Sequence, residues 1–326
     1  MKLGVIGTGM IATEFLPYLV NMPELEVQAV LSTPRSLEKA KKLCREYHIP
    51  CATDRFEKLC DAGVDTVYIA VPNLLHRDYC VRAIEAGLNV IVEKPLASRI
   101  EEVRELKALA KDRRRFLFEA ITTLYLPAYQ KIAEWLPRIG EVKLVQSQFC
   151  QFSSRYRAFQ RGEIAPVFDP KQAGGAMMDL NLYNLHYVMG LFGVPESADY
   201  RPELERGIDT SGVTLLCYPG FSALCTSAKS CGGAGWGLIQ GTDGCIRSLG
   251  TPNHVGDIVL ELYDGTREVF SGTSLEERAL PEMRAFARAI QEEDYAFCWQ
   301  QLERSAAVSE VQTAARRSAG ILFPGE

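Results

Sequence analysis

Lys94 is the residue whose type and position most clearly suggest chemistry. It lies between Glu93 and a proline, directly after the apolar run 90–92. That run is typical of a strand in a parallel sheet, and ligands bind at the carboxyl ends of such strands. A lysine that meets another positive charge there has a lowered pKa and becomes useful as an acid or base. On its own a lysine at a strand end is more often a surface cation. Whether Lys94 belongs to a functional site therefore depends on the other motifs of the chain.

A second group of ionisable residues lies in the other half of the chain. Asp179, Tyr183 and His186 are spaced i, i+4 and i+7, which places them on one face of a helix. The residues between them are largely apolar, so the helix is otherwise built for burial. Ionisable groups on such a helix favour a lined cleft. The same pattern would also suit Tyr183 and His186 as satisfied core or interface groups.

A glycine-rich turn near the N-terminus predicts a nucleotide site. Residues 7–12 read Gly-Thr-Gly-Met-Ile-Ala, which matches the dinucleotide-binding pattern G-x-G-x-x-A. The turn follows a predicted strand and opens a predicted helix, whose free N–H groups suit a pyrophosphate. A glycine turn of a sheet protein that binds another ligand is the alternative. The predicted cofactor contacts here are Gly7, Thr8, Gly9, Met10 and Ile11.

The end of the second predicted strand bears on the choice of cofactor. An acidic residue is expected there to hold the ribose 2′-OH of NAD, and none is present. Ser32, Thr33 and Arg35 stand at that point and could hold a 2′-phosphate instead. We therefore predict NADP in preference to NAD. Arg35 could also be an ordinary solvated loop residue.

The elements that must position these residues divide the chain into two predicted domains. Residues 1–120 alternate near-continuous apolar strands with helices, which is typical of a doubly wound parallel sheet, a Rossmann domain. Residues 121–326 contain a helix near 177–192 and a series of short strands separated by strong turn signals. The second half is therefore predicted to be an α+β domain with a largely antiparallel open sheet, to which the family resemblance given below assigns substrate binding and oligomerisation.

The bulk composition excludes several other classes of protein. A formal net charge of -5 on 326 residues gives no basic face for a nucleic acid. The ten cysteines are scattered without a C-x-x-C pair, so no metal site is predicted. No run approaches the ~18 apolar residues of a membrane helix, and no targeting segment is visible, so we expect a cytoplasmic protein.

The motifs together resemble the glucose–fructose oxidoreductase, inositol dehydrogenase and rhizopine-catabolism (Gfo/Idh/MocA) family. The resemblance spans nearly the whole chain, although residues after about 195 match in pattern only. It is carried by the turn at 7–12, by Val71, Pro72, Asn73 and His76, by Glu93 and Lys94, by the segment 168–170 and by the segment 174–179. It implies that Val71, Pro72, Asn73, His76, Glu93 and Lys94 line the cofactor.

The resemblance also assigns roles in catalysis. Where family members read D-x-G-x-H-x-x-D, this chain keeps Asp179 but has Tyr183 in place of the histidine and His186 in place of the second aspartate. With a tyrosine at this position, the chain resembles the branch of the family that contains dimeric dihydrodiol dehydrogenase. The resemblance implies that Tyr183 is the acid/base, that Lys94 supplies the cation a phenol needs near neutrality, and that Asp179 orients Lys94 or the substrate. His186 would line the substrate pocket.

The family implies an NAD(P)-dependent dehydrogenase or reductase acting on the CH–OH group of a sugar, polyol or dicarbonyl compound. Two alternatives remain at this stage: a glycosidase-type enzyme with retained NAD, and a non-catalytic NAD(P)-binding regulator. Relatives pair through the open sheet of the second domain, so we expect a homodimer or a higher homo-oligomer.

Overall fold

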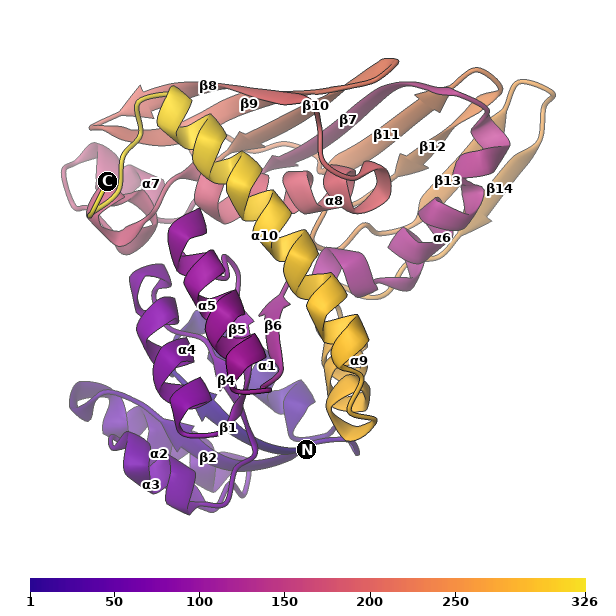
Figure 1. Ribbon diagram of the computed structural model, residues 1–326. Coiled ribbons are helices and arrows are strands. Elements are labelled where there is room, and N and C mark those ends of the chain that lie inside the picture. The colour runs from indigo at the N-terminus through magenta and orange to yellow at the C-terminus, as the bar shows by residue number, and fades with distance from the viewer. The chain divides into compact units, whose positions relative to one another are not determined.

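The computed structural model describes residues 1–326, which form two compact units (Figure 1). The first unit contains Met1–Ala120 and Glu282–Ala306, and the second contains Ile121–Pro281 and Ala307–Glu326. The C-terminal helices are therefore shared between the units. Leu302 and Ala306 belong to the apolar core of the first unit, which explains why this helical stretch groups with it.

The first unit is built on a six-stranded parallel sheet. Its spatial order is β3-β2-β1-β4-β5-β6, the order of the Rossmann fold. The prediction of a doubly wound parallel sheet is confirmed. The strands are β1 (Lys2–Ile6), β2 (Glu26–Leu31), β3 (Cys51–Thr53), β4 (Thr66–Ile69), β5 (Asn89–Glu93) and β6 (Leu117–Ala120).

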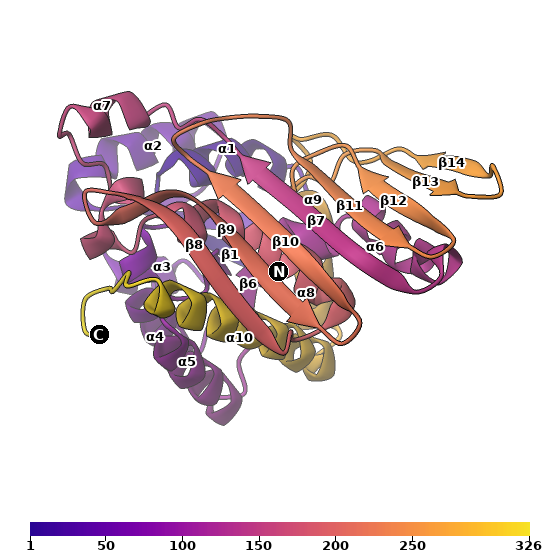
Figure 2. The ribbon, with the colours of Figure 1, turned by 90° about the horizontal axis from the view of Figure 1, so that it is seen from above.

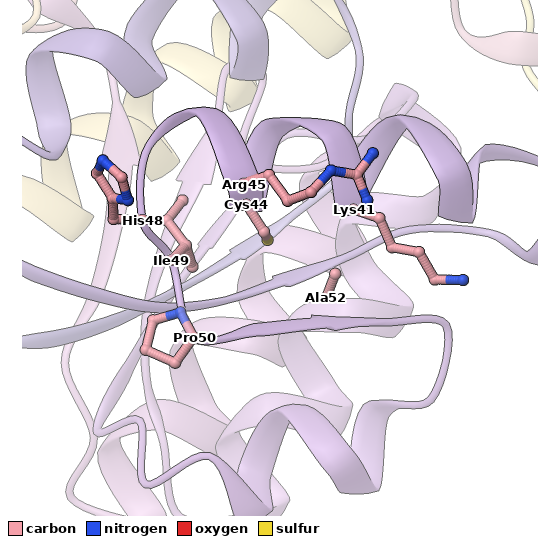
Figure 3. Close-up of a pocket in the computed structure, with 7 residues that line it drawn as sticks. All are labelled: Lys41, Cys44, Arg45, His48, Ile49, Pro50 and Ala52. Atoms are coloured by element: carbon pink, nitrogen blue, oxygen red, sulfur yellow. The ribbon is translucent and has the colours of Figure 1, made fainter.

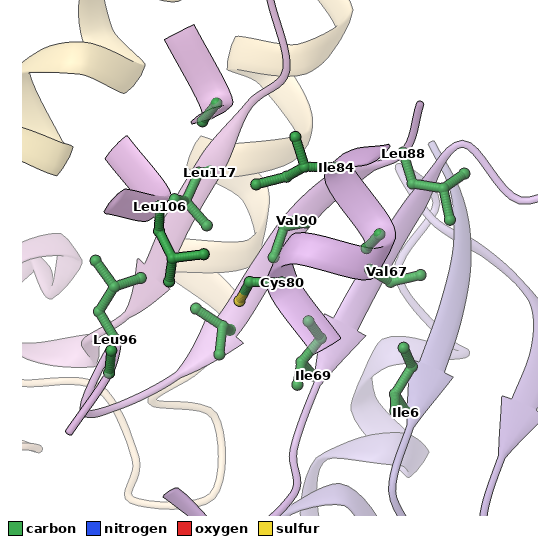
Figure 4. Close-up of a cluster of buried hydrophobic side chains, with 14 of the residues drawn as sticks. Ile6, Val67, Ile69, Cys80, Ile84, Leu88, Val90, Leu96, Leu106 and Leu117 are labelled. Atoms are coloured by element: carbon green, nitrogen blue, oxygen red, sulfur yellow. The ribbon is translucent and has the colours of Figure 1, made fainter. Parts of the chain in front are cut away.

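Helices connect these strands and cover the sheet. Apolar side chains from the helices that follow β4 and β5, and from the central strands, pack into one buried cluster, which includes Ile84, Val90 and Leu106 (Figure 4). None of the helices of the chain combines the length and the apolar character that a membrane span requires. The helices of this unit are α1 (Met10–Leu19), α2 (Leu37–Glu46), α3 (Phe56–Asp61), α4 (His76–Glu85), α5 (Ile100–Asp112), most of α9 (Leu280–Gln291) and the first half of α10 (Tyr295–Ser318).

The second unit is built on an eight-stranded sheet of order β14-β13-β12-β11-β7-β10-β9-β8 (Figure 2). Only β7 and β10 pair in parallel, and every other neighbouring pair is antiparallel. The predicted largely antiparallel open sheet is confirmed. The strands are β7 (Val142–Cys150), β8 (Ser197–Glu205), β9 (Ile208–Tyr218), β10 (Phe221–Ala228), β11 (Trp236–Gly241), β12 (Gly244–Ser248), β13 (Ile258–Leu262) and β14 (Arg267–Phe270).

One helical segment of the second unit departs from a regular helix. The pattern predicts a helix over 177–192, but the structure has a π-helix, Met177–Asn181, followed by α8 (Leu182–Phe192). Single π-turns are rare and are found frequently at functional sites. The irregular turn contains Asp179, the residue that sequence analysis placed in the catalytic site. The remaining helices are α6 (Pro127–Trp135) and α7 (Tyr156–Gln160).

Replacing Gly7 by alanine should destabilise the first unit more than a comparable change elsewhere. Gly7 has φ +116, and a Cβ atom there would lie 2.2 Å from the carbonyl oxygen of Ala70. We expect Gly7→Ala to cost about 2–4 kcal/mol, since backbone strain and steric overlap add. Urea unfolding followed by circular dichroism measures the loss.

Gly63→Ala is the matched control for this change. Gly63 also has a positive φ, +75, but no atom lies within 4 Å of its added Cβ. It should cost only about 1 kcal/mol, the strain of the backbone alone. Equal losses for the two variants would contradict the close packing of the Gly7 turn.

Candidate active site

The glycine turn leaves backbone N–H groups without a side-chain cap. Gly7 lies between β1 and α1, and its amide donates to the carbonyl oxygen of Leu31 at 2.8 Å. Gly9 precedes α1 as its N-cap and has no side chain to accept from the first amides of the helix. A Cβ on Gly9 would have only the Ala70 oxygen nearby, at 3.9 Å. The start of α1 can therefore receive an anion close to the backbone.

The helix that follows β2 carries, in its first turn, a cation that was not predicted from the sequence. Thr33 and Arg35 are exposed and Ser32 is buried, as the segment leaves the sheet. Lys39, in the first turn of α2, donates from Nζ to the carbonyl oxygen of Thr8 at 2.5 Å. Lys39 therefore ties the helix after β2 to the glycine turn. A basic residue in the first turn of that helix is the sequence signal that could have revealed it.

His76 connects the loops that follow β4 and β5. Its Nδ1 lies 2.7 Å from the carbonyl oxygen of Pro95, and its Nε2 lies 2.9 Å from that of Val71. The ring is buried, and burial is the main cause that lowers the pKa of His76. A neutral ring has one N–H, so it donates to one of the two carbonyls. His76 thus holds the segments that contain Val71, Pro72, Asn73 and Lys94 together.

Two buried carboxylates lie at or near the carboxyl ends of neighbouring strands of this sheet. Glu93, the last residue of β5, accepts from the Tyr68 hydroxyl at 2.5 Å. Glu119, on β6, accepts from the amide of Leu96 at 2.8 Å. Both glutamates are at least nine-tenths buried. They brace the loop in which Lys94 lies. Tyr68 and Glu119 were not expected from the sequence.

In the second unit, Asp179 and Tyr183 are the accessible members of an otherwise buried helical segment. Every other residue from 173 to 189 is buried, including His186, which is 1% exposed. The Tyr183 ring lies 5.7 Å from the ring of Phe149, which is on β7. The structure thus leaves Asp179 and Tyr183 partly accessible and places His186 in the interior.

Lys229 is buried and forms an ion pair with Asp179, which is partly exposed. It follows β10 directly, its side chain is 5% exposed, and its Nζ contacts Oδ2 of Asp179. Lys229 also lies above the ring of Phe168, with Nζ 5.5 Å from the ring centroid. Nothing in the local sequence pattern marks this lysine, because its partner is far away along the chain.

Asp209 anchors the turn that leads into the π-helix. The carboxylate accepts from the amide of Met177 and from the hydroxyl of Tyr200, both at 2.6 Å. A Cβ on Gly175 would lie 2.0 Å from Oδ1 of Asp209, so glycine is required there. Burial raises the pKa of Asp209 to about 6, while these hydrogen bonds and the charge of Lys229 act in the lowering direction.

A hollow on the first unit contains none of the predicted site residues (Figure 3). It lies beside α2 and the edge strand β3. It is lined by Lys41, Cys44, Arg45, His48, Ile49, Pro50 and Ala52. No group of three or more His, Cys, Asp or Glu side chains is placed to hold a metal ion anywhere in the chain.

The fold and the glycine turn define a dinucleotide-binding protein, and comparison with known proteins is consistent with this class. The family model for Gfo/Idh/MocA proteins, described as an oxidoreductase family with an NAD-binding Rossmann fold, matches residues 1–120. The chain is 30% identical over 328 residues to scyllo-inositol 2-dehydrogenase (NADP(+)) IolU of Bacillus subtilis (strain 168), covering 100% of this chain and 99% of that protein. It is 31% identical over 226 residues to trans-1,2-dihydrobenzene-1,2-diol dehydrogenase of Mus musculus, covering 68% of this chain and 66% of the relative.

Solved structures share the whole fold. KijD10, a 3-ketoreductase from Actinomadura kijaniata in complex with NADP and TDP-benzene, has a TM-score of 0.82 and 25% sequence identity, and the match covers 97% of both chains. Levoglucosan dehydrogenase, at 18% identity, has a TM-score of 0.83 over 98% of this chain and 97% of its own.

The chain belongs to the Gfo/Idh/MocA family of NAD-binding oxidoreductases. The predicted family and the predicted class of enzyme, an NAD(P)-dependent dehydrogenase or reductase acting on CH–OH groups, are thereby confirmed.

The raised pKa of Asp209 predicts a pH-dependent contribution to stability. The folded state binds a proton on this carboxyl more readily than the unfolded chain between about pH 4 and pH 6. The contribution is therefore fully present below about pH 4 and is lost as the pH rises through 6. The free energy of unfolding of the wild type, relative to Asp209→Asn, should fall by about 2.4 kcal/mol between pH 4 and pH 7.5.

Chemical denaturation at the two pH values tests this. Asp199→Asn, a change at an exposed carboxylate on β8, is measured in the same way as the control. A difference between wild type and Asp209→Asn that stays constant with pH would contradict the assignment.

Proposed function

We propose that this protein is an NADP-preferring oxidoreductase that moves a hydride between nicotinamide and the carbinol or carbonyl carbon of a sugar, polyol or related small molecule. The observation that carries the proposal is that the predicted site residues of the first unit follow the carboxyl ends of neighbouring strands of the parallel sheet. Strands β1, β4 and β5 are neighbours, so the Gly7 turn, the Pro72–Asn73 loop and Lys94 follow the carboxyl ends of adjacent strands. Ligands of open α/β sheets bind at these carboxyl ends.

The residues of the first unit suit a dinucleotide. A close-packed Gly7 and an uncapped α1 make a cradle for a pyrophosphate, formed by Gly7, Thr8, Gly9, Met10 and Ile11. Val71, Pro72, Asn73, His76 and Glu93 would border the nicotinamide end, with His76 acting through the loops that it joins. When bound, the nicotinamide supplies the redox chemistry by giving or accepting a hydride.

The end of β2 supports NADP rather than NAD. No acidic residue follows this strand to hold a ribose 2′-OH, and Ser32, Thr33 and Arg35 lie there instead. Lys39 adds a second cation, already directed at the backbone of Thr8. Two cations and two hydroxyls suit a 2′-phosphate, for which charge-assisted hydrogen bonds are strong. The relative IolU is named for NADP(+), and KijD10 is described in complex with NADP.

In the proposed mechanism Tyr183 exchanges a proton with the substrate oxygen. A phenol has a pKa near 10 and needs a neighbouring cation to act near neutral pH, which is the role of Lys94. Asp179 would orient a substrate hydroxyl or Lys94, and His186 would support the helix from inside the pocket wall. The accessibility of Asp179 and Tyr183 in a buried helix supports these roles.

The names of two relatives support the proposed substrate class. IolU is named for scyllo-inositol, and the mouse relative for trans-1,2-dihydrobenzene-1,2-diol; both are compounds with neighbouring hydroxyl groups. A carboxylate such as Asp179 beside a tyrosine suits such a compound, because it can accept from one hydroxyl while the other reacts.

The protein is further proposed to form a homodimer through the open face of its large sheet. Leu144, Val213, Leu215 and Leu224 lie on β7, β9 and β10, and each is 36–38% exposed. In register, Leu224 lies opposite Leu215 on the neighbouring strand. Exposed apolar residues clustered on a sheet face mark an association surface.

Tyr183→Phe and Lys94→Ala should each lower kcat/KM by about 100- to 10,000-fold, the usual loss of a general acid/base and its activating charge. The measurement uses a substrate panel of scyllo-inositol, trans-1,2-dihydrobenzene-1,2-diol and D-glucose with NADP(+), and of diacetyl with NADPH. Tyr263→Phe, at a tyrosine that is 73% exposed, is the control and should keep wild-type activity. Undiminished turnover in both site variants would remove the catalytic assignment.

Arg35→Ala and Lys39→Ala should each weaken NADPH binding by about tenfold and leave NADH binding nearly unchanged, since each removes one charge-assisted contact to the 2′-phosphate. Fluorescence titration of both cofactors measures this. Lys41→Ala, on the same helix and paired with Glu38, is the control and should change neither affinity. Equal weakening of NADPH and NADH would contradict recognition of a 2′-phosphate.

A further inference from the structure

Lys229 is the buried cation that the catalytic roles above leave unused. Its residue as a whole is 4% exposed, and its Nζ contacts the carboxylate of Asp179. A lysine is rarely buried unless it is paired. Removing the charge of a lysine from water costs several kcal/mol, and a well-packed apolar residue often serves stability as well. An ion pair at this position therefore invites a functional explanation.

The two partners of this pair differ in accessibility. The side chain of Lys229 is 5% exposed, whereas that of Asp179 is 32% exposed. The ammonium is thus the inner partner, and the carboxylate is the partner that another molecule can reach. In such an arrangement the lysine can fix the position of the carboxylate without itself meeting the substrate.

The backbone around Lys229 is held on both sides. Its amide donates to the carbonyl oxygen of Thr210 at 2.7 Å, and its own carbonyl accepts from the amide of Ser153 at 2.9 Å. Its Nζ lies above the ring of Phe168. The ammonium therefore stands on a rigid support, as a residue that positions another should.

The neighbouring carboxylate Asp209 does not compete for the place of Asp179. It is 1% exposed and already accepts from Tyr200 and from the Met177 amide. Asp209 fixes the start of the π-helix, while Lys229 contacts the side chain of Asp179 within that helix. The two groups fix the backbone and the carboxylate of Asp179 separately.

We propose that Lys229 is a positioning residue for the reaction, which holds the Asp179 carboxylate charged and in one orientation so that Asp179 accepts a hydrogen bond from a substrate hydroxyl. This inference rests on the proposed function, because it assigns Asp179 to the substrate site. It predicts that Lys229 acts on turnover only through Asp179. Cofactor binding, which belongs to the first unit, should not depend on it.

A double-mutant cycle tests this role. Steady-state kinetics are measured on the panel compound that the wild type turns over fastest, for Lys229→Met, Asp179→Asn and the double variant. We expect Lys229→Met to lower kcat/KM by about 10- to 100-fold, since a misplaced group costs this much. In the Asp179→Asn background the same change should have almost no further effect. A purely structural lysine would instead lower activity by the same factor in both backgrounds.

Companion variants separate charge from folding. Lys229→Arg keeps the charge and should recover most of the lost kcat/KM, whereas Lys229→Gln keeps a hydrogen-bond donor without charge and should not. Lys171→Met, at an exposed lysine of the same unit, is the matched control. Thermal unfolding and NADPH titration of every variant check that fold and cofactor site are intact. Lys229→Gln also supplies the cycle if Lys229→Met fails to fold.

The outcomes distinguish the two proposals. Two results obtained with an active wild type would overturn the role of Lys229 alone. In the first, Lys229→Met is as active as the wild type. In the second, the losses of kcat/KM in the two single variants multiply in the double variant. A wild type that binds NADPH but turns over no compound of the panel overturns the proposed function, and the role of Lys229 with it.

Discussion

A single buried carboxylate holds together the part of the second unit that carries the candidate catalytic residues. Asp209, on β9, joins the hydroxyl of Tyr200 on β8 to the first amide of the π-helix, and it packs against Gly175. Burying such a group is costly unless it is fully hydrogen-bonded. The segments that supply these partners are therefore fixed in one arrangement, and Asp179 and Tyr183 inherit their positions from it.

A comparable constraint organises the first unit, where it begins with a close backbone contact. Gly7 approaches the carbonyl of Ala70 too closely for any side chain, which keeps the turn after β1 against the end of β4. His76 then connects the end of β4 with the loop after β5, and buried glutamates brace that loop. Lys94 thus lies in a loop held by backbone contacts on several sides, which is what a preorganised site requires.

Features encoded locally could be predicted from the sequence. Apolar runs interrupted by helical patterns were enough for the parallel sheet, and turn signals were enough for most of the antiparallel sheet. The short elements β3, α3 and β6 were not predicted, because three to six residues give too little periodicity. Strand β8 was not predicted either, because it is largely polar and contains Pro202, which an edge strand tolerates.

The contacts that were missed all join residues that are distant along the chain. Lys229 reaches Asp179 across 50 residues, and Lys39 reaches Thr8 across 31. No local pattern shows which residue each lysine contacts, since these pairs arise only when the sheet has formed. The π-turn around Asp179 was also missed, because its residues have ordinary helical character. His186 shares the spacing of Asp179 and Tyr183, yet the structure buries it.

Isotope transfer tests most directly whether this protein moves a hydride between a substrate carbon and nicotinamide. scyllo-Inositol with deuterium on its ring carbons is incubated with NADP(+) and the wild-type protein, and the reduced cofactor is analysed by mass spectrometry. Direct hydride transfer predicts one deuterium in each molecule of NADPH formed. Reduced cofactor without deuterium, or no reduced cofactor with this or any other polyol of the panel, would contradict it.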